Sequence, residues 1–149
     1  MSAAVVLNAD PAGILSNPNS THRVMKCRQW LVDWLVAGRR VLLPEVVDYE
    51  VRRELIRAGM AQSLTLLDTL AQQAEYLPIT TGAMRRAAEL WAQARSQGWQ
   101  TAPDPALDCD VILAAQALTL GEPAIIVATG NVRHIARYVP ADAWTNIVP

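Results

Sequence analysis

Short apolar runs that alternate with longer segments of helical periodicity constrain the fold of this chain more than any other feature. The runs are too short for helices and have the apolar character of buried strands. They lie at residues 3–7, 40–44, 75–79 and 124–129. Between them, apolar residues recur at helical spacing over residues 21–38, 45–59, 63–73, 81–98 and 109–120. This alternation predicts an α/β protein, a three-layer α/β/α sandwich whose central sheet is mostly parallel.

The size and composition of the chain limit the classes of protein that it can represent. With 149 residues, 52% of them hydrophobic, it fits a single domain over residues 1–149. A net charge of −1 gives no strongly basic field, so a nucleic acid would have to be bound by local arginines. Cys27 and Cys109 lack the spacing of a zinc site, and no apolar stretch has the length of a membrane span. We therefore expect a cytoplasmic protein with reduced thiols and no membrane contact.

Oxygen-bearing side chains gather where the predicted strands end. In open parallel sheets, ligands bind beyond the carboxyl ends of the strands, so side chains at these places lie near one another. They are Asn8 and Asp10 after the first run, Glu50 in the helix after the second, Asp108 and Asp110 at the start of the helix before the fourth, and Thr129 and Asn131 after it.

Several of these residues also have a simpler structural explanation. An aspartate ahead of an apolar helix usually caps it, which would account for Asp108. Asp110 lies two residues further on and on another face of the helix, so one cap does not explain both. Glu50 could pair with an arginine on a solvated helix face, and Asp10 could bond backbone amides in the turn before Pro11.

Taken together, the oxygen ligands favour a divalent metal site. Carboxylates and amides suit Mg²⁺ or Mn²⁺, which bridge to substrate phosphates. Such an ion activates water and stabilises charge on the attacked phosphate, so no side-chain nucleophile is needed. Phosphatases of the haloacid dehalogenase type are excluded, because they need a lysine late in the chain and Lys26 is the only lysine.

Four segments stand out, in this order along the chain: "VVLNAD" (5–10), "VVDYEVRREL" (46–55), "DCDVILAAQALTLG" (108–121) and "IIVATGNVRHI" (125–135). Together they resemble the four motif regions of PIN domains, the fold of VapC-type toxin ribonucleases. The resemblance spans nearly the whole chain and implies a PIN-like fold. In the family, four acidic positions hold one or two divalent metals for the hydrolysis of single-stranded RNA.

The resemblance also implies the roles of individual residues. Glu50 matches the second acidic position, Asp110 the third, and Asp108 is an auxiliary carboxylate. The first position is held by Asn8, with Asp10 two residues later as a partial replacement. The fourth is held by Asn131, which would orient metal-bound waters, and Thr129 would hydrogen-bond the site.

The expected function is therefore a Mg²⁺- or Mn²⁺-dependent endoribonuclease that cleaves single-stranded RNA, as the toxin of a toxin–antitoxin pair with a cognate antitoxin. We also expect a homodimer, with Trp30 and Trp34 on one short helix as candidate contact surface. The alternative is a PIN-like module that has lost catalysis and binds RNA or protein. In that module, arginines would contact phosphates, and the candidates are Arg52, Arg53, Arg57, Arg133 and Arg137.

Overall fold

A five-stranded parallel sheet forms the centre of the protein in a computed structural model that describes residues 3–98 and 104–149. The strand order is β3-β2-β1-β4-β5, and every neighbouring pair is parallel. The strands are β1 (Ala4–Leu7), β2 (Arg40–Pro44), β3 (Glu75–Leu77), β4 (Ile125–Ala128) and β5 (Ala141–Asp142). The α/β class and the parallel sheet predicted from the sequence are confirmed.

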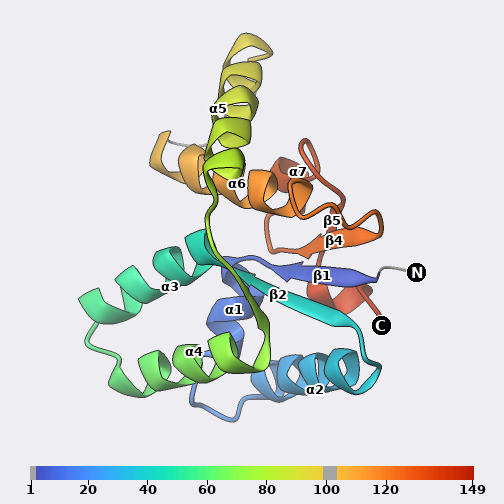
Figure 1. Cartoon of the computed structure of the whole chain (residues 1–149). Helices are drawn as coiled ribbons and strands as arrows, with labels where there is room; N and C mark the ends of the chain where they lie inside the picture. Colours follow the sequence, from blue (N-terminus) through green and yellow to red (C-terminus); the bar gives the residue numbers. More distant parts are fainter. Residues whose placement is uncertain (1–2, 99–103) are drawn as a thin grey trace.

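Helices cover both faces of the sheet, as Figure 1 shows. They are α1 (Ala9–Leu15), α2 (His22–Val36), α3 (Glu45–Arg57), α4 (Ala61–Gln73), α5 (Thr81–Ser96), α6 (Asp104–Leu118) and α7 (Val132–Ile135), followed by a 3₁₀ turn, η1 (Trp144–Asn146). Helices α1, α2 and α4 lie on one side, and α5, α6 and α7 lie on the other. Helix α3 follows β2 directly and contacts α1 and α4 as well as α6.

The strand order reverses its direction of growth at the β1–β4 pair. From β1 the chain moves outward through β2 to β3, and then returns to add β4 and β5 on the other side of β1. At such a switch point the connections leave to opposite faces, which opens a crevice beyond the carboxyl ends of the strands. In this protein the crevice lies beyond Leu7 and Ala128, which pair in the sheet.

The core explains why β1 reads as a continuous apolar run. All four of its residues are fully buried, because helices cover both faces of the strand. Trp30 packs against both Trp34 and Trp144 in the same core, with ring centroids 6.3 and 6.0 Å away. Trp30 is 8% exposed and Trp34 is fully buried, so the expectation that they provide surface for a dimer contact is wrong.

Three elements differ from the prediction. Helix α1 is not predicted, because its sequence "ADPAGIL" contains Pro11 and Gly13 and carries no clear helical period. Helix α6 begins at Asp104 and not near Asp108, so the two aspartates lie inside the helix and do not open it. The fifth strand, Ala141–Asp142, is not predicted, because two residues are too few to show an apolar run.

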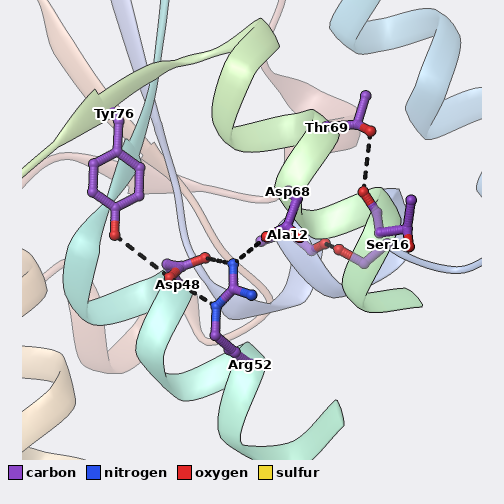
Figure 2. Close-up of polar contacts among 8 residues, drawn as sticks. Ala12, Ser16, Asp48, Arg52, Asp68, Thr69 and Tyr76 are labelled. Atoms are coloured by element: carbon purple, nitrogen blue, oxygen red, sulfur yellow. Dashed lines mark hydrogen bonds and ion pairs between the residues drawn. The ribbon is translucent and has the colours of Figure 1, made fainter. Parts of the chain in front are cut away.

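Helix α3 is tied to its neighbours by Arg52 (Figure 2). The Arg52 guanidinium donates to both oxygens of Asp48, at 3.2 and 3.0 Å, and to Asp68 of α4 at 2.7 Å. Tyr76 of β3 donates its hydroxyl to the same Asp48 at 3.4 Å. Arg52 therefore joins α3 to α4 and is engaged by two carboxylates, so it is a poor candidate for the phosphate contacts expected of it.

No helix within the described ranges is both long and apolar enough to span a membrane.

Candidate functional site

Glu50 and Asp110 approach each other at the carboxyl edge of the sheet. Glu50 lies in α3, which starts directly after β2, and Asp110 lies in α6, which packs against α3. Burial raises the pKa of Asp110 from 3.8 to about 6, and the negative charge of Glu50 acts in the same direction. Two carboxylates are thus held close together in a partly desolvated place.

Cys109 belongs to the same group of side chains. Burial raises the pKa of its thiol to about 11, and the charge of Glu50 and a hydrogen bond with it act in the same direction. The thiol is therefore protonated at neutral pH and serves as a small buried neighbour of Glu50, without the reactivity of a thiolate. Arg53 lies over the ring of Tyr49, 5.0 Å from its centroid, and is the cation that acts on both Cys109 and Glu50.

Gln116 fixes the two helices that carry these carboxylates. Its side chain is 2% exposed and uses both ends of its amide. The oxygen accepts from the backbone N–H of Val46 at 3.3 Å, and the nitrogen donates to the carbonyl of Leu77 at 2.7 Å. One buried side chain of α6 therefore holds both the start of α3 and the end of β3, which sets the position of Glu50 relative to Asp110.

Asn8 occupies the end of β1 at the switch point. Its side-chain nitrogen donates to the Thr129 hydroxyl oxygen at 2.8 Å, and its side-chain oxygen accepts from the N–H of Ala9 at 2.7 Å, which caps α1. Thr129 also accepts from the N–H of Asn131 at 2.9 Å. Asn8 and Thr129 are 8% and 1% exposed, so this hydrogen-bonded link between β1 and β4 is buried.

Asp10, in the first turn of α1, lies beside Arg23 and Gly130. Its carboxylate accepts from Arg23 of α2 at 3.5 Å, and its side chain lies against Gly130, where an added Cβ would meet it at 3.0–3.2 Å. Asp10 and Arg23 both line a pocket of about 400 Å³. The alternative considered from the sequence, backbone bonding in the turn before Pro11, is not its environment, because Pro11 lies inside α1.

Asp108 lies in a third environment. It lines a hollow between α5 and α6 with Trp91, Val111 and others, and it is exposed. Residues two apart on a helix are about 200° apart around its axis, so Asp108 and Asp110 point to different sides. The structure brings Glu50 and Asp110 together and links Asn8 to Thr129, which also accepts from Asn131. It places Asp10 beside Gly130 and Asp108 in the hollow between α5 and α6.

The carboxylates of Glu50 and Asp110 suit weak binding of a hard cation such as Mg²⁺. Among residues 3–98 and 104–149, no three His, Cys, Asp or Glu side chains form a cluster arranged to hold a metal ion. Mg²⁺, however, is usually bound by one or two carboxylates, several waters and substrate phosphates, and Glu50 with Asp110 supplies two carboxylates. Their mutual repulsion, which contributes to the raised pKa of Asp110, is what a bound cation would relieve.

Two residues of this region escape the sequence prediction. Gln116 is the single polar side chain within the run "VILAAQAL", and an uncharged polar residue at a core position is a signal for a buried hydrogen bond. Tyr138 lies close enough to Asp110 for the carboxylate charge to add to the burial that raises the pKa of the phenol. It follows α7 in the sequence, and no spacing pattern indicates that it lies near α6.

Comparison with protein-family profiles gives a match over most of the chain. The PIN domain family profile matches residues 21–138 of the chain. No curated protein matches the sequence significantly.

Solved structures provide the second comparison. The chain is similar to VapBC2 from Rickettsia felis, solved bound to a DNA fragment from their promoter, with a TM-score of 0.73 and 13% identity. It is also similar to VapBC-1 from nontypeable Haemophilus influenzae (TM-score 0.63, 17% identity) and to DNA-bound VapBC from Salmonella typhimurium (TM-score 0.64, 17% identity). Each match covers 95% of this chain and 98% of the other. At these identities the likeness shows a shared fold.

Proposed function

Because this chain belongs to the PIN domain family, we propose that it is a Mg²⁺- or Mn²⁺-dependent endoribonuclease that hydrolyses single-stranded RNA. The observation that carries the proposal is the Glu50–Asp110 pair at the carboxyl edge of the sheet. The pair is partly buried, and its repulsion helps to raise the pKa of Asp110 to about 6. A protein gains nothing in stability from such a pair, which favours a functional reason for it.

In this proposal Glu50 and Asp110 hold the metal. When bound, the ion supplies activation of water and neutralises charge on the phosphate. Asp110 is partly desolvated, so its interaction with a cation is stronger than it would be in water. Gln116 keeps α3 and α6 at the spacing that the two ligands need, through its bonds to Val46 and Leu77.

Asn8, Thr129 and Asn131, at the ends of β1 and β4, fix the shape of the crevice beside these strands. The Thr129 oxygen accepts from Asn8 and from the N–H of Asn131, which fixes the segment after β4 beside β1. Its own hydroxyl proton remains able to donate to a group in the crevice. We propose that Thr129 and Asn131 orient the substrate phosphate and its waters, while Asp108 and Asp10 act outside the metal's immediate surroundings.

We further propose a toxin role with a cognate antitoxin, since the solved structures of this fold include VapBC complexes. A homodimer and a cytoplasmic location are part of the same proposal.

One observation favours a second function, a PIN-like module that binds RNA or protein without cutting. The Asn8 oxygen, the atom that would bind a metal, already accepts from the N–H of Ala9, and the amide nitrogen is bonded to Thr129, so one lone pair of the oxygen is left for a metal. An amide also binds a hard cation more weakly than a carboxylate. The two functions differ in whether Glu50 and Asp110 alone can sustain hydrolysis.

Cleavage of a labelled single-stranded RNA separates them. The parent protein is incubated with the RNA in Mn²⁺ or in EDTA, beside the variants Glu50→Gln and Asp110→Asn. The nuclease proposal expects cleavage in Mn²⁺ that stops in EDTA and in both variants. Binding without cleavage in saturating Mn²⁺, at the same affinity in all three proteins, would favour the binding module.

A further inference from the structure

A basic pocket beside the candidate site has no role in the proposed metal chemistry. It has a volume of about 400 Å³, and its lining includes His22, Arg23 and Lys26 from the first turns of α2. This volume lies within the range of ligand pockets. The chain as a whole has a net charge of −1, so the two cationic side chains at this hollow, Arg23 and Lys26, form a local concentration of positive charge.

The pocket lies at the same edge of the sheet as the Glu50–Asp110 pair. Its other walls are Thr129 and Gly130, which follow β4, and Ala143, Trp144 and Thr145, which follow β5. Thr129 is also the hydrogen-bond partner of Asn8 at the end of β1. The segment Thr129–Asn131 therefore borders the basic pocket and also belongs to the hydrogen-bonded carboxyl ends of β1 and β4.

The charges within the pocket are incompletely neutralised. Asp10 is the one acidic residue in the lining, and it accepts a hydrogen bond from Arg23 at 3.5 Å, with the two side chains 36% and 65% exposed. An exposed pair with a single long contact is weak. In the described part of the chain, no ion pair or hydrogen bond is found for the side chain of Lys26, whose ammonium is thus able to bind an anion in the pocket.

We infer that this pocket binds a backbone phosphate of single-stranded RNA, next to the phosphate that is cut, with Arg23 and Lys26 as the phosphate ligands. The inference rests on the proposed function for the nature of the substrate. Asp10 holds Arg23 in the empty protein and competes with the phosphate for it. RNA that crosses Thr129–Asn131 reaches both the carboxylate pair and the basic pocket, so the pocket sets the position and direction of the strand.

The experiment measures binding without cleavage. A short fluorescent single-stranded RNA is titrated with protein in EDTA, and anisotropy is recorded over a series of salt concentrations. The proteins are the parent, Arg23→Gln, Lys26→Gln and Asp10→Asn. Arg86→Gln is the matched control, because Arg86 is also an exposed arginine bonded to a carboxylate, Glu89 at 2.8 Å, but lies on α5.

The expected results differ in sign between the variants. Lys26→Gln and Arg23→Gln weaken RNA binding and make the plot of log affinity against log salt shallower, by about 0.7 for each phosphate that the protein no longer neutralises. Asp10→Asn strengthens binding several-fold, because it removes the competitor and leaves Arg23 in place. Arg86→Gln binds as the parent does.

A second titration with inorganic phosphate, followed by calorimetry, distinguishes an RNA phosphate from a small free anion. Binding of RNA but not of inorganic phosphate, abolished in Lys26→Gln, assigns the pocket to the RNA backbone. Phosphate binding with no RNA binding overturns the RNA assignment, and equal RNA affinity in the parent, Lys26→Gln and Asp10→Asn overturns the pocket itself. Since no metal is present, a protein that fails to cut RNA can still pass this test, and a protein that cuts RNA can fail it.

Discussion

The close approach of Glu50 and Asp110 predicts that Asp110→Asn makes the metal-free protein more stable at neutral pH. In the folded protein, burial and the charge of Glu50 raise the pKa of Asp110 from 3.8 to about 6. The folded state therefore holds this proton more tightly than the unfolded state does. Stability contributed by the protonated carboxyl is fully present below about pH 4 and is lost as the pH rises to about 6. The amide of the variant carries no charge and escapes this loss.

The size of the effect follows from the same pKa. A change from 3.8 to about 6 corresponds to at most about 3 kcal/mol, at 1.36 kcal/mol for each pH unit. Asp110 is only partly buried, so solvent screens the penalty and we expect about 1 to 2 kcal/mol. With a urea m-value of about 2 kcal/mol/M, the unfolding midpoint rises by roughly 0.5 to 1 M. Glu50→Gln should stabilise less, since repulsion is the smaller of the two causes.

The assay is urea unfolding in EDTA near neutral pH and again below about pH 4, with Asp108→Asn as the control. Asp108 is an exposed aspartate of the same helix, and its variant should stay within about 0.5 kcal/mol of the parent. The advantage of Asp110→Asn should disappear at the lower pH. Two results would refute the reasoning. In the first, Asp110→Asn is no more stable than the parent at neutral pH. In the second, its gain in stability over the parent is the same at both pH values.

Three further predictions follow from other contacts. Gln116→Leu leaves the Val46 N–H and the Leu77 carbonyl without their hydrogen-bond partner. We therefore expect the free energy of unfolding, measured in urea, to fall by about 1 to 3 kcal/mol and Mn²⁺ binding to weaken. Unchanged stability would mean that this buried amide does not hold α3 and α6 together. Arg52→Met removes the cation that Asp48 and Asp68 share and should lower the free energy of unfolding by about 1 to 2 kcal/mol. Arg57→Gln, which breaks the exposed ion pair with Glu54, should change it by less than about 1 kcal/mol. Equal effects of the two substitutions would contradict the role given to Arg52. Asn8→Asp adds a carboxylate beside Thr129 and should raise the initial rate of Mn²⁺-dependent RNA cleavage. The rate should rise about tenfold for each 1.4 kcal/mol by which metal binding becomes stronger. A rate at or below that of the parent would exclude this position as a metal ligand.

Much of the fold could be predicted from the sequence, because the strands and helices have distinct periods. The run "AVVL" of β1 and the stripe of α3 follow the rules for a buried strand and an amphipathic helix. Helix α1 is not predicted because Pro11 and Gly13 interrupt the apolar period of a helix. Its N-cap residue, Asn8, is interpreted from the sequence as a metal ligand and not as a cap. The start of α6 at Asp104 escapes prediction because the apolar pattern begins later than the helix.

The candidate site could be predicted less completely, for a geometric reason. Chain order and parallel strands bring Glu50 and Asp110 to one edge, so their proximity follows from the topology. The direction of a side chain depends on helix phase and on its neighbours, which is why Asp108 lies toward α5 and Asp10 toward Arg23. Gln116 and Tyr138 reach the site through tertiary packing alone, which no local pattern encodes.

Calorimetric titration of Mn²⁺ tests most directly whether Glu50 and Asp110 form a metal site. The parent, Glu50→Gln, Asp110→Asn and the control Asp108→Asn are titrated at neutral pH after treatment with EDTA and its removal. We predict saturable binding by the parent and by Asp108→Asn, and a loss of at least about tenfold in affinity, about 1.4 kcal/mol, in each of the other two. Mn²⁺ affinity that is the same in all four proteins, or absent from the parent, would contradict the central claim.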